Sequence, residues 1–106
     1  MILKVNELPA NLCCIYKINY PNHKIYIGCT VDLKRRMREH NKNAHKVLQP
    51  CDAAIKKYGE IEEIEILEFI NDISLMEEKE RYWISFYNAQ DKNIGYNLTP
   101  GGNACN

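Results

Sequence analysis

The feature that most constrains the fold is a pair of strand-like segments joined by a short turn. Residues 12–20 and 24–29 are rich in β-branched, aromatic and other apolar residues, which is typical of β-strands. Between them, the stretch from Pro21 to Lys24 supplies turn chemistry. The two segments therefore predict a β-hairpin. Near the end of its second strand, Gly28 allows another group to approach the backbone closely.

Three helices and one more strand are predicted after the hairpin. Thr30 or Asp32 can cap a helix that runs to about Asn41. Ser74 and Glu77 have the spacing of a capping box, which predicts a helix to about Tyr87. The other predicted elements are a loop over 41–49, a short helix over 51–58 followed by Gly59, and a strand over 61–70.

These elements predict one small α/β domain with a central, largely antiparallel three-stranded sheet flanked by helices. A chain of 106 residues has the size of a single domain, which we place at 1–106. Its core is expected at about 12–99, with a tail or the start of a linker at 100–106. The Gly and Pro residues near the end of the chain favour such a boundary.

Composition indicates an intracellular protein, cytoplasmic or nuclear, that does not enter a membrane. No apolar run approaches the roughly 20 residues that span a bilayer, and no signal peptide is visible. The five cysteines are odd in number and irregularly spaced, so a disulfide framework is not expected. Because they form no Cys-x-x-Cys pair, the spacing also argues against a structural zinc site. They are interpreted as reduced thiols.

Charge is distributed unevenly along a chain whose net charge is zero. Residues 23–46 carry seven lysines and arginines against two acidic residues, a net charge of +5. Residues 60–80 carry nine acidic residues against one lysine, a net charge of −8. This pattern suits a basic surface for phosphates and an acidic region for a cation, and it suits two solvated faces equally well.

Two spacings place polar groups beside apolar ones. On the first predicted helix, Arg36 and His40 are four residues apart and border the stripe of Leu33 and Met37, where a cleft would be lined. On the last, Glu80 falls on the apolar side of the helix. A buried carboxylate requires a compensating partner. Glu80 is therefore either a structural ion-pair partner of Arg81, Arg36 or a lysine, or a metal ligand.

Five motifs occur in an order that resembles the GIY-YIG nuclease domain. They are Cys14-Ile15-Tyr16, Tyr26-Ile27-Gly28, Arg36 with His40, Glu80 ahead of Tyr82-Trp83-Ile84, and Gly95-Tyr96-Asn97. The resemblance extends from about Leu12 to Gly102. One departure is Cys14, which stands where the family name implies glycine. The ending Tyr-Asn-Leu-Thr-Pro-Gly-Gly is most similar to the homing-endonuclease and mobile-element branch.

The resemblance implies an endonuclease that hydrolyses DNA phosphodiesters with Mg²⁺ or Mn²⁺. It implies that Glu80 holds the metal and that Arg36 stabilises charge on the phosphate, to which a planar guanidinium is suited. Tyr16 and Tyr26 are both candidates for the general base, and His40 would orient the tyrosine or relay its proton.

The resemblance also implies supporting residues and partners. Gly28 and Asn97 would support the site. Basic residues of the +5 segment are expected to contact DNA: Lys34, Arg35, Arg38 and Lys42. A separate DNA-binding domain or partner protein is expected, as in the homing branch. The alternatives are a non-catalytic DNA-binding module and a nuclease subunit that needs a partner.

Overall fold

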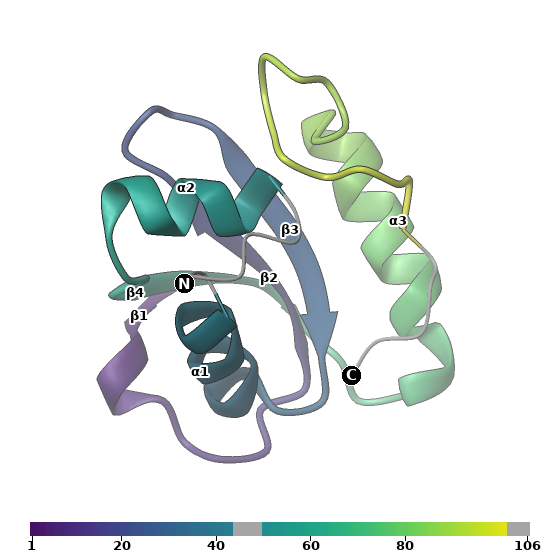
Figure 1. Cartoon of the computed structure of the whole chain (residues 1–106). Helices are drawn as coiled ribbons and strands as arrows, with labels where there is room; N and C mark the ends of the chain where they lie inside the picture. Colours follow the sequence, from purple (N-terminus) through teal and green to yellow (C-terminus); the bar gives the residue numbers. More distant parts are fainter. Residues whose placement is uncertain (44–49, 102–106) are drawn as a thin grey trace.

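A four-stranded antiparallel sheet forms the centre of the computed structural model, which describes residues 1–43 and 50–101 (Figure 1). The strand order is β1-β4-β2-β3. The strands are β1 (Ile2–Lys4), β2 (Cys14–Asn19), β3 (Ile25–Thr30) and β4 (Glu63–Phe69). The helices are α1 (Leu33–Asn43), α2 (Pro50–Tyr58) and α3 (Met76–Tyr87), with short 3-10 turns at Val5–Glu7 and Ile73–Leu75. Strand β3 is therefore an edge of the sheet.

The predicted hairpin is formed by β2 and β3, and its register places both candidate tyrosines on one face. Tyr16 pairs with Gly28, and Ile18 pairs with Tyr26. Because directly opposed residues share a face and side chains alternate along a strand, Tyr16 and Tyr26 lie diagonally across the same face. The turn between the strands includes His23 with a positive φ of 70°.

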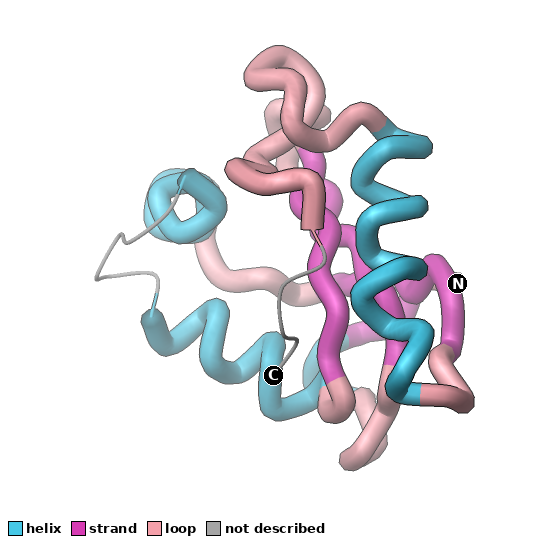
Figure 2. The backbone as a smooth tube through the Cα atoms, turned by 90° about the vertical axis from the view of Figure 1, so that its right-hand side faces the viewer, coloured by secondary structure: helices cyan, strands magenta, loops and turns pink. Residues whose placement is uncertain are grey.

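The sheet lies between two helical layers, each with its own hydrophobic cluster (Figure 2). On one face Tyr16 and Ile18 pack with Leu33 and Met37 of α1 and Ile55 of α2. On the other face, side chains of β2 and β3 pack with α3; they include Ile15, Ile27, Met76 and Ile84. This arrangement explains why the hairpin strands are mostly apolar, because each is covered on both faces over most of its length; Lys17 and Asn19 of β2 are the exceptions.

The predicted class is confirmed, and the sheet has one strand more than predicted. The additional strand, β1, pairs with β4 through Ile2–Glu65, Leu3–Ile64 and Lys4–Glu63. Three residues are too few for a recognisable alternation, so its pairing depends on the tertiary structure. Helix α1 continues to Asn43, into the predicted loop. The rest of that loop (44–49) and the end of the predicted tail (102–106) lie outside the described residues.

Two helix ends agree with the capping predicted from the sequence, and a third differs from it. Asp32 caps α1, because its Oδ1 accepts a hydrogen bond from the Arg35 amide at 3.3 Å. Gly59 ends α2 with a φ of 98°. The predicted capping box at Ser74 is wrong. Asp72 instead accepts from the Ser74 amide and hydroxyl, at 3.0 and 2.7 Å, which stabilises the 3-10 turn before α3.

Among the cysteines of the described residues, one departs from the prediction; Cys105 lies outside these residues. Cys13, Cys14 and Cys51 carry thiols, whereas Cys29 is disulfide-bonded, so the expectation of reduced cysteines throughout is wrong. Over residues 1–43 and 50–101, each helix is too short or too polar to cross a bilayer. The cellular location stays a prediction.

Candidate active site

The site begins where Tyr16 crosses Gly28 on the neighbouring strand. Tyr16 is completely buried. A Cβ atom at Gly28 would overlap the Tyr16 hydroxyl and the adjacent ring carbon. Glycine is therefore required here for a steric reason, because the Tyr16 ring occupies the space that a side chain at position 28 would fill.

His40 joins the two tyrosines from α1. Its Nε2 atom lies 3.0 Å from the Tyr16 hydroxyl. Its ring is 6.1 Å from the Tyr16 ring and 5.7 Å from the Tyr26 ring, edge to face in both cases. Burial, assisted by the positive charge of Arg36, lowers the pKa of His40 to about 4. The imidazole is therefore neutral near pH 7, so one ring nitrogen can accept a proton.

The two tyrosines differ in exposure. Burial raises the pKa of Tyr16 above its ordinary value, and Tyr26 adds to that effect while Arg36 opposes it. Tyr26 is half-buried. Burial raises the pKa of Tyr26 to about 12, Arg36 lowers it and the carboxylate of Glu80 raises it. Both hydroxyls are protonated near pH 7, and Tyr26 is the one that solvent can reach.

Arg36 places a charged group beside these hydroxyls. Its side chain is 27% exposed, and its Nη1 atom lies 3.5 Å from Glu39 Oε2. Its Nε atom is the one buried side-chain N or O atom without a hydrogen-bond partner among the described residues. Burial alone would lower the pKa of Arg36, but its neighbours, led by Tyr16, raise it. A charged group with an unmatched N–H donor is suited to a phosphate oxygen.

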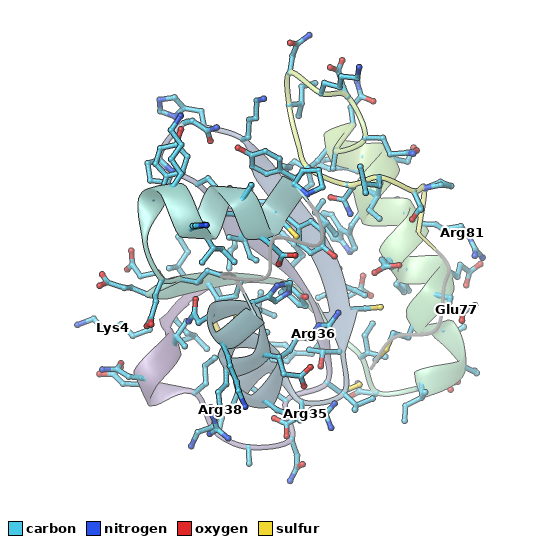
Figure 3. The ribbon with its side chains drawn as sticks, viewed as in Figure 1. Lys4, Arg35, Arg36, Arg38, Glu77 and Arg81 are labelled. Atoms are coloured by element: carbon cyan, nitrogen blue, oxygen red, sulfur yellow. The ribbon has the colours of Figure 1, made fainter. Side chains whose placement is uncertain are left out.

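Glu80 approaches from the other layer. Helix α3 packs against β3 and β2, and Glu80 is half-buried on it. Glu77 and Arg81 on the same helix point away from the sheet (Figure 3). The charge of Glu80 acts on Tyr26, and a Cβ atom at Gly101 would lie 3.0 Å from Glu80 Oε1. The carboxylate of Glu80 thus lies against a glycine and acts on Tyr26, and its hard oxygen atoms suit Mg²⁺ or Mn²⁺.

Asn97 holds the edge strand that carries Tyr26 and Gly28. Its Nδ2 donates to the Ile27 carbonyl at 2.8 Å, and its Oδ1 accepts from the Ile27 amide at 2.9 Å. The residues just before it continue this pairing, since the Tyr96 amide donates to the Ile25 carbonyl at 2.9 Å. Asn97 is buried and acts on the backbone of β3, not on the tyrosines directly.

The basic residues predicted to contact DNA lie on another side of α1. Successive residues of a helix are about 100° apart, so Lys34 and Arg38 project roughly 160° away from Arg36. In Figure 3, Arg36 is directed toward β3, whereas Arg38 leaves the helix on the opposite side. Lys34, Arg38 and Lys42 are exposed, and Arg35 pairs with Glu39 at 3.3 Å.

Two residues that the sequence did not single out also border the site. Cys51 and Asp52, in the first turn of α2, are buried, and their ligand atoms and that of His40 lie within 4.8 Å of one another. Both side chains influence the pKa of Tyr26. The sequence carries no signal for this proximity, because it depends on how α1 and α2 meet over the sheet.

Comparison with known proteins assigns the family. Residues 12–94 match the GIY-YIG catalytic domain, and the chain belongs to the GIY-YIG family. It is 35% identical over 101 residues to intron-associated endonuclease 1 of enterobacteria phage T4, covering 86% of this chain and 39% of that protein. The chain thus spans about two fifths of the length of this curated relative.

Solved structures show the same fold. The catalytic domain of the homing endonuclease I-TevI superposes with a TM-score of 0.66 at 30% identity, covering 82% of this chain and 98% of that domain. A point mutant of the I-TevI catalytic domain superposes with a TM-score of 0.72 at 28% identity, covering 85% of this chain and 96% of that one.

Proposed function

We propose that the protein is a divalent-metal-dependent DNA endonuclease, with Mg²⁺ or Mn²⁺ as its ion. The observation that carries this proposal is the convergence of two tyrosines, a neutral histidine, an arginine and a carboxylate beside one sheet edge. Tyr16, Tyr26, His40 and Arg36 meet on the α1 face, and the field of Glu80 reaches Tyr26 from α3. The family membership and the name of the phage relative support hydrolysis of DNA.

Each residue has a distinct task in this mechanism. Arg36, whose side chain is partly exposed, donates from its guanidinium to a phosphate oxygen and stabilises the charge that develops there. Glu80 would hold the ion, with water and substrate phosphate as the other ligands; a bound divalent ion supplies Lewis acidity and neutralises charge on the leaving oxygen. The metal ligand and the phosphate clamp thus come from opposite layers of the domain.

We assign the general base to Tyr26 and a positioning role to Tyr16. Tyr26 is the more exposed of the two and lies in the field of Glu80. Its hydroxyl has a high pKa in the protein alone, so a neighbouring cation and Arg36 are needed to favour the phenolate. Tyr16 is buried and bonded to His40, so it fixes the imidazole that borders Tyr26.

The decisive experiment is nicking of supercoiled plasmid DNA with Mg²⁺ or Mn²⁺ and with chelator. Glu80→Gln keeps the size of the side chain and removes its charge, and we expect it to reduce cleavage by at least about a hundredfold. Glu77→Gln, on the outer side of the same helix, is the matched control and is expected to cleave normally. Cleavage by Glu80→Gln at the normal rate would overturn the metal-ligand assignment.

A non-catalytic DNA-binding module would bind DNA but leave the plasmid intact with either metal ion. A nuclease subunit would cleave only after addition of a partner protein. Because the phage relative is much longer than this chain, we also propose that a separate DNA-binding region, on this chain or on a partner, supplies target recognition. We propose an intracellular location as well, in the cytoplasm or nucleus.

A further inference from the structure

We propose that His40, Cys51 and Asp52 form a binding site for a thiophilic transition-metal ion such as Zn²⁺, and that occupation of this site inhibits the nuclease. The site differs from the Glu80 site in position and in ligand chemistry. It combines an imidazole nitrogen from α1 with a sulfur and a carboxylate from the first turn of α2.

The geometry needs only a small closure to fit zinc. The three ligand atoms lie within 4.8 Å of one another. In a tetrahedral site with Zn–S near 2.3 Å and Zn–N or Zn–O near 2.0 Å, ligand atoms are about 3.5 Å apart. Side-chain rotations that move the ligand atoms by about 1 Å would bring them to the separation that zinc requires, and water would complete the coordination.

Burial and ligand type favour zinc over magnesium at this position. Cys51 is 1% exposed, and His40 and Asp52 are each 8% exposed. Sulfur and imidazole ligands suit Zn²⁺ and Co²⁺, whereas Mg²⁺ prefers oxygen ligands with several waters. The Arg36 guanidinium, which acts on His40 and on Cys51, opposes a cation. A thiolate and a carboxylate together supply the negative charge that offsets this repulsion, and the thiol proton is released when the ion binds.

Occupation of the site would remove His40 from its arrangement beside the two tyrosines, whichever of its nitrogens binds the ion. Ligation through Nε2 would displace the Tyr16 hydroxyl, which that nitrogen now contacts at 3.0 Å. Ligation through the other nitrogen would leave the proton on Nε2, so the ring could no longer accept one. The inhibitory part of the inference rests on the proposed function, whereas metal binding itself does not.

Binding is tested by titrating the metal-free chain with Co²⁺, under conditions that keep the Cys29 disulfide intact and Cys51 as a thiol. A cobalt–thiolate bond gives a charge-transfer band in the near ultraviolet, and Zn²⁺ should displace the cobalt and remove the band. Cys51→Ser should abolish the band, and Cys13→Ser, which removes a thiol outside the cluster, should keep it. Asp52→Asn keeps the thiol, so it should keep the band and weaken affinity by about tenfold or more.

Inhibition is tested by adding Zn²⁺ to plasmid nicking supported by Mg²⁺. The rate of each variant is compared with its own rate without zinc, and we expect Cys51→Ser to require at least about tenfold more zinc than the wild type for half-inhibition. A cobalt band that persists in Cys51→Ser, or no band in the wild-type chain, would overturn the site. Equal zinc sensitivity of wild type and Cys51→Ser would overturn the inhibition. If no variant nicks DNA, the proposed function fails, and the cobalt spectra still decide the site.

Discussion

The Tyr16 hydroxyl and the Nε2 atom of His40 form a buried contact of 3.0 Å between strand β2 and helix α1. It links residues that are 24 positions apart in the sequence, and burial keeps the imidazole neutral. The Tyr26 ring also packs edge to face against the same histidine. His40 therefore affects both the stability of the domain and the positions of the two candidate bases.

Burial of neutral His40 should make the domain less stable in mild acid. The pKa is about 4 in the fold and about 6.5 in an unfolded chain, so the unfolded state binds more protons between these pH values. Stability contributed by neutral His40 is therefore complete above pH 6.5 and is lost as the pH falls toward 4, by on the order of 3 kcal/mol. Urea unfolding at pH 7 and pH 4.5 measures this change.

His40→Gln is the comparison, because glutamine does not titrate. The variant should lose less stability over the same pH interval, whatever its stability at pH 7. Equal pH dependence in the two proteins would show that His40 titrates in the fold as it does in the unfolded chain.

Replacement of each tyrosine by phenylalanine should separate chemistry from positioning. Tyr26→Phe should slow cleavage by about a hundredfold or more with little change in stability, since it removes a general base. Tyr16→Phe leaves the buried His40 nitrogen without its partner, which costs about 1–3 kcal/mol. Single-turnover cleavage and thermal unfolding together give the comparison. A normal cleavage rate for Tyr26→Phe beside an inactive but folded Tyr16→Phe would exchange the two assignments.

Gly28→Ala should damage the site because a methyl group at this position overlaps the Tyr16 hydroxyl. Overpacking of this kind costs about 1–3 kcal/mol, and displacement of the Tyr16 ring should reduce cleavage as well. Gly59→Ala is the control: Gly59 has a φ of 98° and open space around it, so this variant should lose stability but keep its cleavage rate when folded. If Gly28→Ala cleaved as well as Gly59→Ala, the close approach would have no catalytic importance.

Lys34 and Arg38 should contribute to DNA binding without taking part in the chemistry, because they project away from Arg36. The double variant Lys34→Gln/Arg38→Gln should bind DNA more weakly. Its binding constant should also depend less on salt, with a slope smaller by about one unit for each phosphate that is no longer neutralised. At saturating DNA its cleavage rate should be nearly normal. Arg36→Gln should show the opposite pattern, with slow cleavage and binding that changes little. A lower cleavage rate of the double variant at saturating DNA would contradict this separation of DNA binding from chemistry.

The local parts of the fold were predictable because their signals are local. The hairpin followed from composition and turn residues, and its register places Gly28 opposite Tyr16. The four-residue spacing placed Arg36 and His40 side by side next to the core; the Arg36 side chain is 27% exposed, as expected at a border, whereas His40 is buried. Helical geometry would also have shown that Lys34 and Arg38 lie away from Arg36, since about 100° per residue decides this without coordinates.

Other features depended on tertiary structure. The edge strand β1 has three residues and gains its order from pairing with β4. At the start of α3, Asp72 binds the amide and hydroxyl of Ser74, which the capping box would have needed. The proximity of Cys51 and Asp52 to His40 depends on how two helices meet, and no spacing of residues encodes it.

The side chain of Asn97 imitates a peptide group. It offers one donor and one acceptor to Ile27, in the positions where a neighbouring strand would pair with β3. An exposed edge beside an active site would otherwise be a template on which a second chain could add a strand. By occupying both groups with one short side chain, the protein keeps this edge closed to self-association while Tyr26 stays accessible. Loss of Asn97 would therefore threaten solubility as well as geometry.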